Sequence, residues 1–182
     1  MKKAWVIFIG LTLFFSSSSI AFAGAEMILK IDGIDGESVI NGHEGEIDVL
    51  AWSWGIAQSG SLHFGGGGGA DSADVQDVSL TKYIDKASVD LMLACLKGDH
   101  LKEAILTMRK AGDQPIDTLV ITMSPVLVTS VNNGGSAGYD RLTENVTLNF
   151  AKVTVSYTPQ KADGSADAAI EFTWNIEKNE QE

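Results

Sequence analysis

The residues 65–69, five consecutive glycines, are the most conspicuous candidate for a ligand-binding loop. Glycine-rich loops can cradle phosphate groups with backbone amides, but a Walker loop also needs a Gly-Lys-Ser/Thr step that enters a helix. Here the run is followed by Ala70 and then by carboxylates at Asp71, Asp74 and Asp77, which would repel a phosphate. The sequence therefore argues against a nucleotide site at these glycines.

Other residue types that could bind a metal or act in catalysis lack a supporting spacing. The letters DGIDGE at 32–37 resemble a calcium loop, but an EF-hand needs oxygen ligands at its third, fifth and twelfth positions. This sequence places Ile34, Gly36 and His43 there, so a turn is the better interpretation. Surface or packing roles are expected for His43, His63, His100 and the single cysteine, Cys95. We expect no enzyme activity and no cofactor.

The charge balance excludes one class of partner. The 182-residue chain has a formal net charge of −11 and is 45% hydrophobic. An acidic chain does not bind nucleic acid or an anionic membrane through bulk electrostatics. The hydrophobic fraction is that of an ordinary globular protein.

The first 23 residues predict an export leader. Lys2 and Lys3 precede an apolar run at 4–15, and a small-x-small pattern then ends at Ala23. These three features in this order are typical of a signal peptide, so cleavage is expected between Ala23 and Gly24. The run is too short for a stable membrane anchor. The alternative is that Met27 is the true start.

The mature chain, 24–182, is expected to be a single domain built mainly of strands. Alternation with period two predicts strands near 27–31, 118–131, 142–158 and 170–176. Pro125 predicts an edge position or a bulge in the second of these, and a switch of apolar parity predicts a bulge near Ala151. At 46–58 a similar switch indicates either a bulge or a strand covered on both faces.

One helix is predicted between the strands, with Ser88 as its N-cap and Gly98 closing it. Its buried stripe would be formed by Val89, Met92, Leu93 and Leu96. The following stretch, 99–110, fits a helix slightly better than a strand by periodicity alone. Many strands with one helix indicate an antiparallel barrel or sandwich with the helix packed on it.

The glycine run also does not read as a linker between domains. Only 24–64 of the mature chain precede it, and the strands there need partners from the later sequence. Ordering such a loop costs on the order of 1–2 kcal/mol of backbone entropy per residue. Glycine allows another backbone to approach closely, so a neighbouring subunit is a candidate for holding the loop.

Several segments together resemble one known family. They are EIDVLAWSWG at 46–55, the glycine-rich loop, VQDVSLTKYIDK at 75–86, LMLAC at 91–95, RKAG at 109–112 and RLTENVTLNF at 141–150. In this order they resemble the haemolysin-coregulated protein (Hcp) family, the tube protein of the type VI secretion system. The resemblance extends from about Met27 to Asn179.

The resemblance implies an antiparallel two-sheet β-barrel with one flanking α-helix and a long extended loop, and it places 103–110 in a strand. It also implies a non-enzymatic homo-hexameric ring that stacks head-to-tail into a tube. The tube would work with a VgrG-type spike protein, sheath proteins and effectors, and would itself be secreted. The extended loop would supply the subunit interface through Ser59, Ser61, His63, Phe64, Gly65, Gly66, Gly67, Gly68, Gly69 and Asp77.

The leader leaves two functional hypotheses open. Family tubes assemble in the cytoplasm, which fits a start at Met27. A cleaved leader would instead give periplasmic transit and an exported Hcp-like ring that binds a protein partner outside a sheath. The N-terminal sequence of the mature protein separates these hypotheses.

Overall fold

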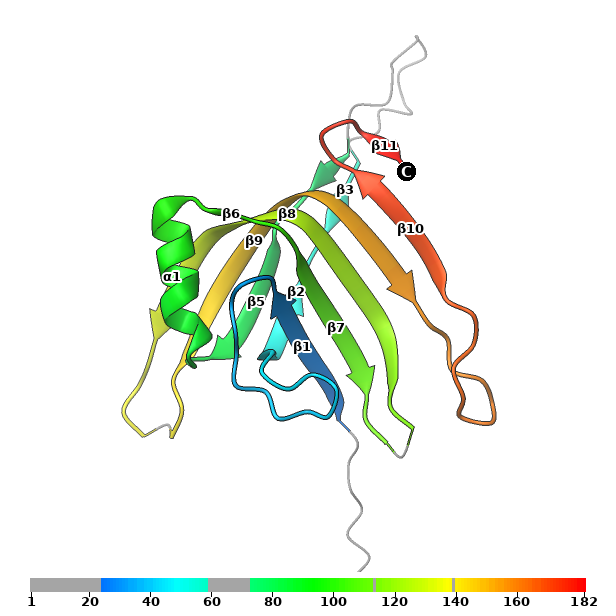
Figure 1. The fold of residues 1–182 in the computed structure, drawn as a ribbon, viewed down its shortest axis with the longest axis horizontal. Coiled ribbons are helices and arrows are strands. Elements are labelled where there is room, and N and C mark those ends of the chain that lie inside the picture. Colours follow the sequence, from blue (N-terminus) through cyan, green and yellow to red (C-terminus); the bar gives the residue numbers. More distant parts are fainter. Residues whose placement is uncertain (1–23, 59–72, 113, 139) are drawn as a thin grey trace, which may run out of the picture.

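The computed structural model describes residues 24–58, 73–112, 114–138 and 140–182. Its strands and single described helix follow in the order β1 Ala25–Ile31, β2 Ile47–Ser53, β3 Ile56–Ala57, β4 Asp74–Val75, β5 Val78–Tyr83, α1 Ala87–Lys97, β6 His100–Leu101, β7 Ala104–Lys110, β8 Ile116–Gly134, β9 Thr143–Tyr157, β10 Ile170–Asn175 and β11 Glu180–Gln181 (Figure 1). The slight preference for a helix that periodicity gave at 99–110 is therefore wrong. This stretch forms β6 and β7, as the family resemblance implied for 103–110.

Six antiparallel strands close into a barrel. The order runs β9-β5-β2-β1-β7-β8, and the additional pairing of β8 with β9 closes the circle. Strands β6, β10 and β11 extend the same sheet, and β3 pairs with β4 in a separate two-stranded ribbon. The predicted fold class, an antiparallel β-barrel with one flanking helix, is confirmed.

Alternating side chains explain how the barrel fills its interior. On β5 the residues Val78, Leu80 and Lys82 are buried and their neighbours are not. Aliphatic side chains from the six barrel strands and from α1 form one continuous buried cluster. Because every second residue of a strand points to the same face, this pattern gives each strand one inward row.

Of the two alternatives for 46–58, the bulge is confirmed, because the pairing of β2 with β5 shifts register between Val49 and Ala51. The bulge expected near Ala151 is wrong, because the β8–β9 register shifts only between Val128 and Ser130. Both long strands change their buried parity together at the level where Pro125 lies opposite Ala151. Because the buried parity switches in both paired strands, the register between them does not shift. In the sequence of β9 alone, this parity switch looks the same as the one that a bulge would cause.

The environment of Pro125 also differs from the prediction. Strand β8 is not an edge, because it pairs with β9 on one side and with β7 and β6 on the other. The proline lies where the partner changes, between Met123, which pairs with β7, and Val126, which pairs with β6. The missing proline N–H therefore removes no bond from a continuous ladder.

Helix α1 packs on the barrel through a different face from the one predicted. Its buried residues are Ala87, Ser88, Leu91 and Ala94. The expected stripe is largely outside, with Leu96 85% exposed and Val89 and Leu93 also exposed. Small side chains on the inner face let the helix approach the sheet closely, and that contact outweighs the greater hydrophobicity of the outer face.

Candidate assembly surface

Most residues predicted for a subunit interface lie outside the described residues. These are Ser59, Ser61, His63, Phe64 and the glycines at 65–69, and the predicted cleavage residue Ala23 lies outside as well. Gly24 is the first described residue and is exposed. The predicted interface role of these positions stays a prediction, and the geometry that bears on it is that of the strands flanking 59–72.

Asp77 is the one predicted interface residue whose side-chain contacts are described. Its two carboxylate oxygens accept hydrogen bonds from Thr129 Oγ1 at 2.9 Å and from Asn149 Nδ2 at 2.7 Å. Asp77 lies immediately before β5, Thr129 lies on β8 and Asn149 lies on β9. Asp77 therefore fixes the point where the chain returns from residues 59–72 to the barrel.

The ribbon at the base of residues 59–72 is attached to the barrel by Trp54. Its indole Nε1 donates to the carbonyl of Gln76 at 2.9 Å, and its ring lies 6.1 Å from that of Phe150. The amide of Gln76 in turn donates to the carbonyl of Gly55 at 3.0 Å. A Cβ on Gly55 would come within 2.8 Å of the Gln76 side chain, so glycine permits this close approach. The two ends of the segment are thus held together.

An apolar groove opens beside this ribbon. It has a volume of about 220 Å³ and is lined by Ile56, Ala73, Val75, Val153, Phe172 and Trp174. The residues come from the ribbon and its flank on one side and from β9 and β10 on the other. None of them carries a charge or an amide side chain, so the groove suits an apolar side chain.

Strand β10 carries the groove's apolar surface past the barrel. Ile170, Phe172 and Trp174 lie opposite residues of β9 that share one face, among them Val153 and Tyr157. Ile170 is 69% exposed and Phe172 is 40% exposed. The strand with alternating apolar residues is confirmed, but the burial expected of that face is wrong for its first half, because β10 lies outside the closed barrel (Figure 1).

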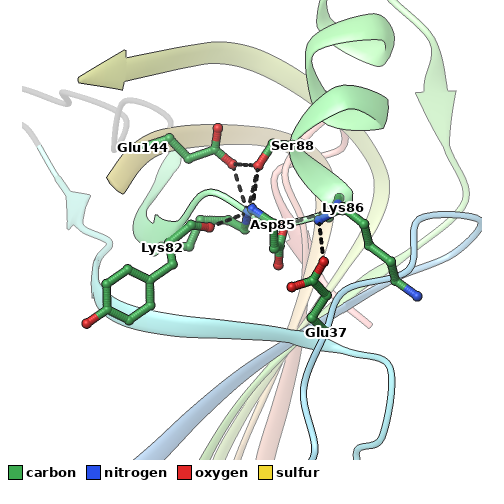
Figure 2. Close-up of polar contacts among 8 residues, drawn as sticks. Glu37, Lys82, Asp85, Lys86, Ser88 and Glu144 are labelled. Carbon is green, nitrogen blue, oxygen red and sulfur yellow. Dashed lines mark hydrogen bonds and ion pairs between the residues drawn. The ribbon is translucent and has the colours of Figure 1, made fainter. Parts of the chain in front are cut away.

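A buried ionic cluster lies at the other side of the barrel, beneath the start of α1 (Figure 2). Lys82 and Glu144 are fully buried and form a direct cross-strand pair between β5 and β9. Lys82 Nζ lies 2.8 Å from Glu144 Oε1 and 2.7 Å from Asp85 Oδ1. Ser88 Oγ donates to Glu144 Oε1 at 2.7 Å. The cluster joins the barrel to the first turn of the helix.

This cluster explains why Ser88 is not the N-cap. The cap position belongs to Lys86, whose side chain makes no capping bond. Asp85 Oδ1 accepts from the Ala87 amide at 3.0 Å, and Glu37 Oε1 accepts from the Lys86 amide at 3.2 Å (Figure 2). Two carboxylates therefore satisfy free amides at the positive end of the helix dipole.

The sequence contained a signal for the cluster that the predictions did not use. Lys82 shares strand parity with Val78 and Leu80, and Glu144 shares it with Val146 and Leu148. A charged residue in an inward row must find a partner, because burying an unpaired charge is very costly. Opposite charges in the inward rows of two strands indicate such a partnership.

A second polar cluster fastens the loop between β1 and β2. His43 Nδ1 lies 2.8 Å from Glu46 Oε2, and Arg109 Nη1 donates to the carbonyl of Asn41 at 2.8 Å. Asp117 Oδ1 lies 3.3 Å from Arg109 Nε.

Within the ranges that the structure describes, no three His, Cys, Asp or Glu side chains gather as a metal site would require. The described helix is also not long and apolar enough to cross a membrane.

The C-terminal Glu182 folds back onto β10. Asn175 Nδ2 donates to its carboxylate at 2.9 Å, and Lys152 Nζ lies 3.5 Å from the other oxygen. The Asn175 hydrogen bond, supported by the positive charges of Lys152 and Lys178, lowers the pKa of Glu182 below its ordinary value. The end of the chain is thus positioned beside the exposed strand.

Comparison of the sequence with known proteins identifies one family. Residues 28–157 match the family model described as "Type VI secretion system effector, Hcp". Protein hcp1 of Pseudomonas aeruginosa PAO1 is 57% identical over 158 residues, which cover 86% of this chain and 98% of that protein.

Solved structures give the same result. Hcp1 from Salmonella typhimurium is 35% identical, with a TM-score of 0.72 over 87% of this chain and 99% of its own. A type VI secretion system effector from Yersinia pestis is 36% identical, with a TM-score of 0.68 over 82% of this chain and 99% of its own. Since a family model and a close relative each cover most of the sequence, this chain belongs to the Hcp family of the type VI secretion system.

Proposed function

We propose that this chain is a non-enzymatic subunit that forms six-membered rings, and that the rings stack head-to-tail into a type VI secretion tube. Family membership supports the tube role. The observation that carries the ring is an exposed apolar face on β10, next to the anchored base of residues 59–72. A protomer with such a face has surface that assembly would remove from water.

The stacked tube would meet partners at its ends, its outer wall and its lumen. We assign these to a VgrG-type spike protein, to sheath proteins and to effectors, as in the family resemblance. No nucleic acid and no stable membrane anchor are part of this function. The acidic charge of the chain, −11, agrees with partners other than nucleic acid.

The experiment that tests the ring is native mass spectrometry of the purified protein and of a variant that lacks residues 65–69. The wild type should be a hexamer. The deletion should keep the melting temperature of the protomer but weaken assembly, because the barrel closes without these residues. A monomeric wild type would refute the ring, and a deletion variant that assembles as well as the wild type would refute the role of the glycines.

An exported ring that binds a protein outside a sheath is the second candidate function. The leader-like residues 1–23 favour it, because a tube that assembles in the cytoplasm needs no export signal. N-terminal sequencing decides between the two. A mature protein that begins at Gly24 supports transit through the periplasm, and one that begins at Met27 in the cytoplasm supports the sheathed tube. The proposed Hcp domain is 24–182 if the leader is cleaved, and it begins at Met27 if that residue is the true start.

A further inference from the structure

A cleft lined by residues of β8, β9 and β10 has a composition that suits an anionic ligand. It has a volume of about 400 Å³, and Lys102 and Lys152 lie in its wall with the amide side chain of Asn175. Glu177 is the only carboxylate among its lining residues, so the lining carries more positive than negative charge on a chain whose net charge is −11. No carboxylate of the described residues pairs with Lys102, which leaves its ammonium group for an anion from outside.

One carboxylate of the chain itself, that of Glu182, is bound by groups that line this cleft. Its Oε1 accepts a hydrogen bond from Asn175 Nδ2 at 2.9 Å, and its Oε2 lies 3.5 Å from Lys152 Nζ. A third positive group outside the lining, Lys178 Nζ, lies 3.7 Å from Oε1. The Asn175 hydrogen bond lowers the pKa of Glu182, because it stabilises the ionised form. The polar groups of the cleft therefore already bind the kind of ligand that their charges favour.

The segment that carries Glu182, residues 176–182, is called the terminal strap here, and few contacts hold its end in place. Strand β11 within it pairs with only Trp174 and Asn175, and both residues of β11 are exposed (Figure 1). The Glu182 amide donates to the carbonyl of Thr173 at 3.1 Å. The strap thus adds a short strand to the edge of β10 while side chains beside that edge bind its carboxylate. This combination of backbone pairing and side-chain recognition is the one by which sheet edges bind extended peptides.

We propose that the edge of β10 at 173–175 and the cleft beside it form a binding site for an extended acidic peptide, and that the terminal strap occupies this site until such a peptide displaces it. The peptide pairs its backbone with β10, as β11 does, and places a carboxylate between Asn175 and Lys152. A second carboxylate of the peptide pairs with Lys102. The strap is an intramolecular competitor, and its attachment to the chain gives it an effective concentration in the millimolar range. This inference goes beyond the proposed tube and does not depend on the ring.

The test measures how a fluorescently labelled peptide of alternating threonine and glutamate binds to the full chain, by fluorescence anisotropy. The variant Glu182→Gln weakens the competing strap, so it should bind this peptide at least about threefold more tightly than the wild type does. Adding Lys152→Gln to that variant should weaken binding about threefold or more, because an exposed ion pair is lost. Adding Lys161→Gln instead is the matched control and should leave binding unchanged. Lys161 is also an exposed lysine, and it lies 3.8 Å from the carboxylate of Asp167, but it does not line the cleft.

Two further ligands separate recognition of the carboxylate from recognition of the strand. A peptide of alternating threonine and glutamine keeps the backbone but lacks the charge, and it should bind at least about threefold more weakly than the acidic peptide. Succinate carries carboxylates without a strand and should not displace the acidic peptide at equal concentration. The inference is overturned if Glu182→Gln binds the acidic peptide no more tightly than the wild type, if Lys152→Gln and Lys161→Gln have the same effect, or if succinate competes as well as the peptide. None of these results bears on the ring, which native mass spectrometry tests separately.

Discussion

Replacing Lys82 by methionine tests the buried ionic cluster most directly. The ammonium group lies 2.7 Å from one carboxylate, Asp85, and 2.8 Å from another, Glu144. No other cation pairs with either carboxylate in the described part of the chain, and Glu144 Oε2 already has no hydrogen-bond partner there. Removal of the lysine therefore leaves two nearby carboxylates without their counterion.

The expected loss of stability follows from the burial of the cluster. The side chains of Lys82 and Glu144 are both 0% exposed, so water cannot solvate the remaining carboxylate unless the barrel opens. Breaking a buried pair by removing one partner costs about 3–5 kcal/mol. In a chain of this length this corresponds to a fall in melting temperature of about 6–20 °C. Urea unfolding measures the change in free energy. Every variant is unfolded at the same protein concentration, because the contribution of assembly to stability depends on that concentration.

Two further variants make the experiment decisive. The double variant Lys82→Met/Glu144→Leu should recover much of the loss, because it removes the fully buried one of the two carboxylates that the single variant leaves without a counterion. Lys86→Met, an exposed lysine nearby, should change the free energy of unfolding by less than about 0.5 kcal/mol. The reasoning is refuted if Lys82→Met costs less than about 1 kcal/mol, or if the double variant is no more stable than the single one.

Three other outcomes are expected. Trp54→Phe keeps the ring contact but loses the hydrogen bond to the Gln76 carbonyl, so unfolding should become easier by about 1 kcal/mol in urea titrations. Glu37→Ala removes a carboxylate from the first amides of α1 and should cost about 0.5–1 kcal/mol, with a smaller loss in high salt. NMR titration should give a pKa for Glu182 below the ordinary 4.5, and Asn175→Ala should raise it. Because the folded pKa is the lower one, this contact stabilises the fold above the ordinary pKa, and the contribution disappears as pH falls through the folded value.

The features that could be predicted from the sequence depend on neighbours in the chain. Period-two alternation predicted the strands, and the change from Val49 to Leu50 allowed for the bulge in β2. Gly98 closes α1 in the left-handed conformation, with φ of 66°, as a glycine at that position predicts. In each case the residues that carry the sequence pattern are the same residues that form the predicted strand, bulge or helix end.

The features that could not be predicted depend on residues far away in the sequence. The face of α1 that packs inward is set by how closely the helix approaches the barrel, and its own sequence cannot reveal that distance. Ser88 has the side chain of an N-cap, but Glu144, 56 residues away, accepts its hydrogen bond instead. A parity switch in β9 alone could not show that β8 switches with it. The groove remained hidden because its two sides are separated by more than seventy residues and meet only in the fold.

The pairing of β5 with β9 also has a consequence for how the protein folds. It joins Lys82 to Glu144, residues that are 62 positions apart, and such long-range contacts slow folding because a large loop must close before they form. A partly closed barrel could not bury either charge alone, so closure and charge pairing must occur in one cooperative step. We therefore expect the barrel to close late in folding. For a protein exported through a leader such as the one predicted at 1–23, this delay is the period in which the chain can still be threaded through a membrane channel.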